Sequence, residues 1–294
     1  MGTSRGAVVS HLDENKTRQN AVNLQDEKNV HWDQDMSYGQ YLGLEALLSC
    51  QRPVSNEHDE MLFVIIHQVS ELWLKQCLHE AHAAARHIAA DQLRPAFKML
   101  SRVARIQEQM IQAWEVLVTM TPSDYVSFRD SLGQSSGFQS HQYRELEFLL
   151  GNKHPGMVKV HRSHSANYQR LMSVLQAPSL YDISLQLLAR RGFKLPASVL
   201  DRDWSEPYEA CAEVEAVWAD IYASTDHHWD LYELAEKLVD TEYNFHKWRF
   251  SHMKTVERII GHKSGTGGTS GVSYLKKALD LKFFPELWSV RTSL

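Results

Sequence analysis

The clearest helical signal in the chain lies in Glu57-His-Asp-Glu-Met-Leu-Phe-Val-Ile-Ile-His-Gln-Val-Ser-Glu-Leu-Trp-Leu74. Ser55 and Asn56 come just before it, and both residue types can accept a hydrogen bond from the first turn of a helix. Within the segment the apolar residues recur at the spacing of one helical face: Met61, Leu62, Ile65, Ile66, Val69, Leu72, Trp73 and Leu74. The segment therefore predicts the start of a long helix with one buried face.

The rest of the sequence extends this helical pattern over most of the 294 residues. Glycine, which weakens a helix, is absent from residues 44–132 and from residues 193–260. Thr121-Pro-Ser-Asp124 marks a further helix start, with a capping threonine and a proline in the first helical position. Other helices are expected at residues 93–119, 138–150, 157–176, 179–191, 208–223, 226–260 and 272–281.

Strand signals are nearly missing, and no Pro/Ser-rich linker or internal repeat divides the chain. We therefore expect an all-α fold in which one large helical domain, residues 31–294, surrounds a buried pocket with long helices. Residues 1–30 are polar, and we expect them to form a flexible, disordered arm before this domain.

Composition narrows the classes of partner. The net charge of -5 supplies no excess of cations for phosphates or an anionic membrane surface, which argues against nucleic acid and lipid as partners. No stretch is apolar for long enough to span a bilayer, and the amino-terminal residues do not resemble a secretory signal. The three cysteines form no C-x-x-C pair. These features favour a cytoplasmic protein that acts on a small molecule.

Two histidines stand out because each lies on an apolar helical face. Phe63 and His67 are four residues apart, so a planar apolar ligand would meet both. His252 follows Phe245 and Trp248 on one stripe of a long predicted helix, where a buried imidazole could serve as a haem ligand. From spacing alone, a hydrogen-bonded core histidine is the commoner interpretation of both positions.

The spacing of the polar candidate site residues also allows more than one interpretation. Tyr125 and Arg129 form another pair four residues apart, and a guanidinium can grip a carboxylate, although a surface ion pair would also explain this arginine. Residues 261–271 hold five of the fourteen glycines but lack the phosphate-loop spacing, so a plain connection and a ligand-closing loop are the alternatives. His79, His82 and His87 are wrongly spaced for a zinc or di-iron site.

Five longer motifs point to one known family. They are Tyr-Gly-Gln-Tyr-Leu at 38–42, His-Asp-Glu-Met-Leu-Phe-Val-Ile-Ile-His-Gln at 58–68, Ser-Ser-Gly-Phe-Gln-Ser at 135–140, Trp-Arg-Phe-Ser-His-Met-Lys-Thr-Val-Glu-Arg at 248–258, and Gly-Thr-Gly-Gly-Thr-Ser-Gly-Val-Ser-Tyr-Leu at 265–275. Together they resemble the tryptophan 2,3-dioxygenase family from about Tyr38 to the carboxyl terminus.

The resemblance implies the activity and the assembly. Members of this family are helical homotetramers that hold haem b and convert L-tryptophan and dioxygen to N-formyl-L-kynurenine, the first step of tryptophan breakdown by the kynurenine route. Tyr38 and Tyr41 fall where the family lends substrate-binding residues from a neighbouring subunit.

The resemblance also assigns the residues around the haem. His252 would be the proximal ligand of the iron, and Ser136 and Gly137 would contact the cofactor. His67 would stand on the opposite, distal side as the catalytic residue that faces the indole nitrogen. The related indoleamine 2,3-dioxygenases usually have serine at this position, so the histidine favours the tryptophan-specific branch.

The remaining assignments concern the substrate. By resemblance, Phe63 would pack against the indole ring, while Arg129 would clamp the carboxylate with Tyr125 beside it. Thr266 would help to hold the ammonium and carboxylate groups, which makes the glycine-rich loop a candidate lid. Two alternatives are a non-catalytic haem sensor, which leaves the carboxylate clamp unexplained, and a helical interaction module without cofactor, which leaves the pocket residues unexplained.

Overall fold

The computed structural model describes residues 37–294 and contains no strand within that range. The predicted all-α fold is confirmed for this part of the chain. The predicted arm of residues 1–30, with its boundary, lies outside the described residues. The chain divides into two compact units, Met1–Cys50 and Gln51–Leu294.

The described part of the first unit contains two short helices that the sequence analysis did not anticipate, α2 (Tyr38–Leu42) and α3 (Leu44–Leu48). Ser37 caps α2, because its hydroxyl accepts a hydrogen bond from the amide of Gln40. Gly43, with φ 61°, ends α2 and begins α3. Helices of five residues are too short to show a periodic pattern, which explains why they were missed.

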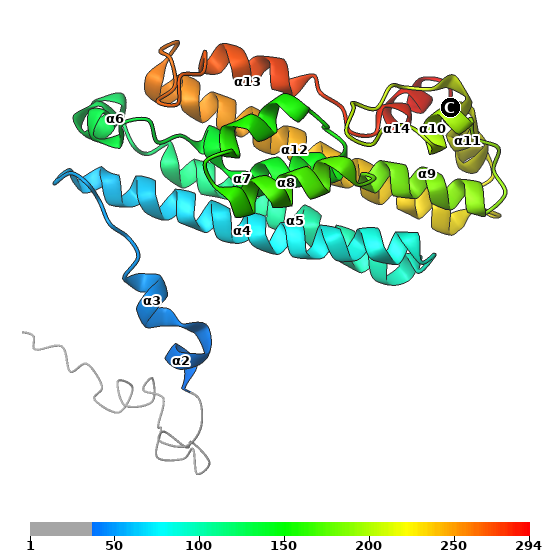
Figure 1. Cartoon of the computed structure of the whole chain (residues 1–294), viewed down its shortest axis with the longest axis horizontal. Helices are drawn as coiled ribbons and strands as arrows, with labels where there is room; N and C mark the ends of the chain where they lie inside the picture. The colour runs from blue at the N-terminus through cyan, green and yellow to red at the C-terminus, as the bar shows by residue number, and fades with distance from the viewer. Residues whose placement is uncertain (1–36) are drawn as a thin grey trace, which may run out of the picture. The chain divides into compact units, whose positions relative to one another are not determined.

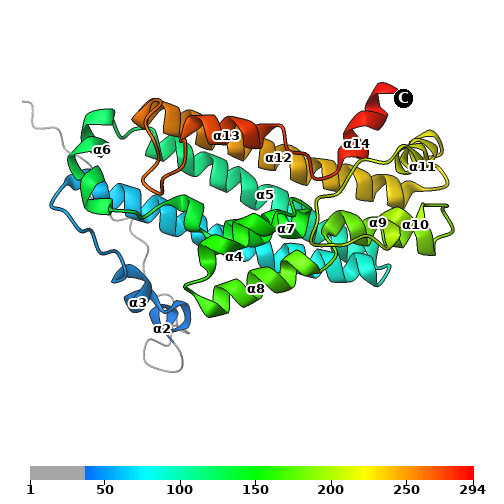
Figure 2. The ribbon, with the colours of Figure 1, turned by 45° about the horizontal axis from the view of Figure 1, so that its top comes forward.

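Three long helices form the frame of the second unit: α4 (His58–Ala89), α5 (Leu93–Leu117) and α12 (Trp229–Ile260). Helix α5 packs along both of the others and lies between them (Figure 1, Figure 2). Its buried face repeats every three to four residues, through Leu100, Val103, Ile106, Met110 and Trp114. The first turns of α4 and the last turns of α5 and α12 consequently meet at the same end of the unit.

Shorter helices cover this frame, with bounds α6 (Pro122–Arg129), α7 (His141–Leu150), α8 (Ser165–Gln176), α9 (Leu180–Arg190), α10 (Ala197–Leu200), α11 (Ala212–Ala223), α13 (Val272–Leu279) and α14 (Pro285–Ser289). Helix α7 packs against α4 and α8, α13 packs against α12, and α6 contacts both α4 and α12. Figure 2 shows α6 and α13 at the end where α12 finishes, and α10, α11 and α14 at the opposite end. No helix among residues 37–294 is long and apolar enough to cross a membrane.

Helix starts were predicted with uneven success. The start at Thr121 is confirmed, because its hydroxyl accepts from the amide of Asp124 while the Asp124 carboxylate accepts from the amide of Thr121. The helix predicted over 157–176 is wrong in its first part: Pro155–His161 forms a 3₁₀ helix, and α8 begins only at Ser165. Residues 137–139 are likewise a separate 3₁₀ turn before α7.

A buried charge network joins α7 to α12. Glu147 is 2% exposed and pairs with Arg144 and with Arg249, whose Nη2 lies 2.6 Å from Glu147 Oε1. The Tyr143 hydroxyl donates to the same oxygen at 2.9 Å. Burial alone would raise the pKa of Glu147, but the charges of Arg144 and Arg249 outweigh it and hold the pKa below the usual value. The carboxylate is therefore ionised and fixes α7 against α12.

We expect Glu147→Gln to reduce the free energy of unfolding by about 3–5 kcal/mol, because two buried guanidinium groups lose their counter-charge. Urea denaturation at neutral pH measures this. Since the folded-state pKa of Glu147 is lowered, the advantage of the wild type is present above the unfolded value near 4.5 and is lost as the pH falls through the folded value. Glu108→Gln, which removes an exposed pair with Arg105, is the matched control and should change stability little. Equal stability of the two variants would contradict the assigned role.

Candidate functional site

Phe63 and His67 lie on one face of the first half of α4, with their ring centroids 4.2 Å apart. His67 Nδ1 lies 2.7 Å from the carbonyl oxygen of Phe63, which can only accept, so Nδ1 carries the hydrogen. Burial lowers the pKa of His67, and the ring is neutral. Its Nε2 has no hydrogen-bond partner within residues 37–294 and therefore offers a free acceptor.

His252 lies on α12 between two tryptophans. Its ring stacks on Trp114 of α5 with centroids 4.8 Å apart and on Trp248, one turn earlier on α12, at 5.4 Å. The ring centroid of Trp114 also lies 6.4 Å from that of His67, so Trp114 contacts both histidines. Burial, followed by the nearby His67, lowers the pKa of His252 to about 4. Its neutral imidazole has no hydrogen bond within the described residues.

Both histidines are largely enclosed by protein without being fully buried. Each is surrounded by enough protein to depress its pKa, yet each keeps an intermediate exposure. Beside them, the indole nitrogens of Trp114 and Trp248 are buried without a hydrogen-bond partner. A neutral imidazole with a free nitrogen can coordinate iron, and two unpaired indole N–H groups can donate to an acceptor on a bound group. The residues present therefore fit a planar prosthetic group that needs one protein ligand.

No group of three or more His, Cys, Asp or Glu side chains among residues 37–294 is arranged to hold a metal ion by itself. The histidines of the 79–87 segment have other contacts: His82 Nε2 lies 2.8 Å from Glu145 Oε1, and His87 Nδ1 lies 2.8 Å from Gln92 Oε1. These contacts are local to α4 and its neighbours, so His252 is the better candidate for a ligand to iron.

Helix α6 brings Tyr125 and Arg129 to the same end of the unit. The Tyr125 ring is buried with its centroid 5.8 Å from that of Phe63. Burial raises the pKa of the Tyr125 hydroxyl, although Arg129 acts in the opposite direction. Arg129 is half-buried, and its Nη2 donates to the carbonyl oxygen of Ser264 at 2.7 Å. The arginine predicted to hold a carboxylate thus contacts the start of the glycine-rich loop.

The glycine-rich loop, residues 261–271, also packs against the 135–140 motif. Thr266 Oγ1 donates to the carbonyl oxygen of Ser135 at 2.5 Å. A Cβ atom on Gly267 would lie 2.6 Å from Ser136 Cβ, a distance that only glycine permits. Gly137, the next residue of the motif, begins a 3₁₀ turn. The loop therefore brings Thr266, Ser136 and Arg129 into one neighbourhood, while its role as a lid stays a prediction.

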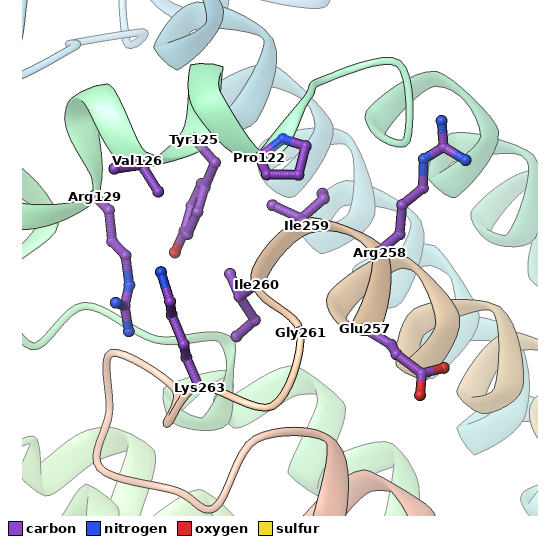
Figure 3. Close-up of a pocket in the computed structure, with 10 residues that line it drawn as sticks. All are labelled: Pro122, Tyr125, Val126, Arg129, Glu257, Arg258, Ile259, Ile260, Gly261 and Lys263. Carbon is purple, nitrogen blue, oxygen red and sulfur yellow. The ribbon is translucent and has the colours of Figure 1, made fainter.

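A cavity of about 220 Å³ opens between α6, the last turn of α12 and the start of the loop (Figure 3). Tyr125 and Arg129 line it, and so does Lys263, which the sequence analysis missed. Trp114 was missed as well, because nothing in its local pattern distinguishes it from a core residue of α5. Tyr38 and Tyr41 belong to the first unit, where each is 75% exposed, and their role stays a prediction.

Comparison with known proteins gives a consistent result. The sequence profile of the tryptophan 2,3-dioxygenase family matches residues 23–176 and 173–294. Tryptophan 2,3-dioxygenases from Bacillus thuringiensis subsp. konkukian and Erythrobacter litoralis are 57% and 59% identical, over 91% and 89% of this chain and 97% and 99% of their own lengths. That of Cupriavidus necator is 55% identical over 88% of both chains.

The matching family and relatives, together with the all-helical fold, define an oxidoreductase of the dioxygenase class. More narrowly, the chain belongs to the tryptophan 2,3-dioxygenase family.

We expect Gly267→Ala to displace the glycine-rich loop, because the added methyl group would overlap Ser136. Amide hydrogen exchange across 261–271 should become faster, while the melting temperature of the whole protein changes little. Ser270→Ala is the control, since Ser270 is exposed in the same loop. Unchanged exchange in the Gly267 variant would show that the loop does not depend on this contact.

Proposed function

We propose that this chain adds both atoms of dioxygen across the C2–C3 bond of the indole ring of L-tryptophan, which yields N-formyl-L-kynurenine and opens the kynurenine route. One observation carries the proposal: the neutral His67 has a free Nε2 and lies beside Phe63, and Trp114 contacts the rings of both His67 and His252. This arrangement suits a flat apolar ring with one N–H donor, and the chain belongs to a family named for this activity.

The proposed cofactor is haem b; His252 would ligate its iron, and Ser136 and Gly137 would contact it. The neutral, unpartnered imidazole of His252 and the unpaired indole N–H groups of Trp114 and Trp248 support this assignment. When bound, haem b supplies the redox chemistry that makes dioxygen reactive. The surrounding protein excludes water from the pocket and fixes the position of the substrate.

His67 positions the indole ring in this proposal. Its Nε2 accepts the indole N–H hydrogen bond, because Nδ1–H is already donated to the Phe63 carbonyl. Phe63 contacts both His67 and Tyr125, so its ring confines the indole laterally. We favour orientation over proton abstraction, since a free indole N–H is far too weak an acid for a neutral imidazole.

Arg129, Tyr125 and Thr266 bind the amino-acid end of the substrate. Arg129 and Thr266 each donate to a backbone carbonyl at present, Ser264 and Ser135 respectively. A substrate carboxylate is a stronger acceptor than a neutral carbonyl and can replace either of them. The loop would then rearrange around the bound amino acid, because it exchanges these backbone contacts for contacts with the substrate.

The proposal extends to assembly and location. We infer a homotetramer in which Tyr38 and Tyr41 complete the site of a neighbouring subunit; their exposure within the first unit supports a contact of this kind. Residues 31–294 would form the catalytic domain after an arm of residues 1–30. We also infer a cytoplasmic location, which the free thiols of Cys77 and Cys211 support. Sedimentation equilibrium of the purified protein tests the assembly.

Oxygen consumption by the reduced, haem-loaded protein on addition of L-tryptophan tests the activity, with mass spectrometry of the product made under ¹⁸O₂. We expect both labelled oxygen atoms in N-formyl-L-kynurenine. A haem sensor would change its absorption spectrum without consuming oxygen, and that result would overturn the proposed reaction.

We expect His252→Ala to lose haem or bind it weakly, because the neutral imidazole of His252, which has no hydrogen bond within residues 37–294, is the proposed ligand of the iron. The ratio of Soret to protein absorbance after purification measures haem content. His246→Ala, on the same helix but directed at the Leu281 carbonyl, is the matched control and should retain haem. Full haem content with an unchanged ferrous spectrum in the His252 variant would remove this residue from the role.

We expect Arg129→Leu to raise the KM for L-tryptophan by about 10- to 100-fold, because a charge-assisted hydrogen bond is worth about 1.5–3 kcal/mol. Tryptamine lacks the carboxylate and should be affected much less. Steady-state kinetics with both compounds measure the difference. If both KM values rose equally, the arginine would not be the carboxylate clamp.

A further inference from the structure

The cavity beside α6 contains a second cationic side chain. Figure 3 shows Lys263 extending toward the Tyr125 hydroxyl, with the guanidinium of Arg129 on the same side. The other charged lining residues, Glu257 and Arg258, point away from this space. The ring centroids of Tyr125 and Phe63 lie 5.8 Å apart, and Tyr125 also lines the cavity. The Tyr125 ring therefore separates the two cations from Phe63, beside which the indole ring is proposed to bind.

The backbone of Lys263 lies at the fixed base of the glycine-rich loop. Its amide donates to the carbonyl oxygen of Ile260 at 3.3 Å, which continues the last turn of α12. On the far side of the loop, a Cβ atom on Gly271 would lie 2.6 Å from the Lys263 carbonyl oxygen. This close approach joins the two ends of the loop and holds Lys263 beside the cavity.

The positive charge at this place is not compensated. The Lys263 ammonium has no ion pair or hydrogen bond within residues 37–294. Glu257 lines the cavity but is engaged by Lys254, with Nζ and Oε2 2.7 Å apart. Arg129 donates to the neutral carbonyl of Ser264 and lies against the neutral Tyr125 hydroxyl, so no carboxylate offsets its charge here. The one carboxylate that lines this cavity is paired with Lys254, so the two cations attract an anion from solution.

We propose that Lys263 is a second carboxylate-binding residue, which shares the carboxylate of the amino-acid substrate with Arg129. The inference rests on the proposed function and adds a specificity determinant to it. Arg129 offers a planar fork with a fixed direction, whereas the ammonium is a point charge on a flexible stem. One oxygen of the carboxylate can bind the guanidinium while the other binds Lys263. Substrates that carry a free carboxylate are thereby favoured over amines and esters.

The experiment compares Lys263→Gln and Lys263→Arg with Lys277→Gln, an exposed lysine on the neighbouring helix α13. Binding of L-tryptophan and of tryptamine to the haem-loaded protein is measured by calorimetry, together with KM. We expect Lys263→Gln to weaken L-tryptophan by about 5- to 10-fold, since an exposed ammonium is partly screened, and to leave tryptamine within about twofold. Lys263→Arg should retain most of the affinity, and Lys277→Gln should match the wild type.

Ionic strength gives a second readout. The affinity of the wild type for L-tryptophan should fall as salt is added, and this dependence should be weaker in Lys263→Gln. Unchanged L-tryptophan affinity in Lys263→Gln, or equal weakening of tryptophan and tryptamine, would overturn the assignment while wild-type turnover still supports the reaction. A wild type that consumes no oxygen with L-tryptophan would instead overturn the proposed function itself.

Discussion

The burial of the imidazole rings of His67 and His252 determines the chemistry that this site can support. Burial disfavours the charged form, so His67 and His252 are both neutral at physiological pH. A neutral imidazole has one nitrogen with a free lone pair. In His67 this nitrogen is Nε2, because Nδ1 carries the hydrogen that is donated to the Phe63 carbonyl. Because that carbonyl belongs to α4 itself, the helix sets the tautomer, and the direction of the acceptor follows from the fold.

The position of His252 depends on a different kind of burial. Arg249 lies three residues earlier on α12 and binds Glu147, while its Nη1 donates to the carbonyl of Ala278 at 3.0 Å. Arginine cannot lose its charge, so its position in the interior requires the carboxylate of α7 to stay beside it. The buried ion pair of Arg249 thus fixes the rotation of α12 about its axis and its position along that axis, and with them the position of the neutral His252. The pocket combines a polar anchor with an apolar interior.

The sequence predicted the parts of this arrangement that depend on periodicity. The long helices that carry His67 and His252 could be read from apolar spacing, and the Thr121 cap marked the start of α6. The 3₁₀ helix at Pro155–His161 could not, because its apolar residues mimic the start of α8. Lys263 was missed for a tertiary reason: its neighbours Arg129 and Tyr125 are more than a hundred residues away in sequence. The spacing of residues also cannot predict which nitrogen of His67 carries the hydrogen, because this depends on the contact between Nδ1 and the Phe63 carbonyl oxygen.

The glycines of the loop at 261–271 differ in what they require. At Gly268, φ is 79°, and apart from Gly268 and its two chain neighbours no atom of residues 37–294 lies within 4 Å of the place that a Cβ atom would take. Only the handedness of the backbone therefore excludes other residues. At Gly267 the backbone is permissive, and volume is the obstacle. A mirror-image amino acid separates the two requirements: D-alanine introduced by chemical ligation would suit the backbone at position 268. The backbone conformation thus requires glycine at position 268, and the lack of space beside Ser136 requires it at position 267.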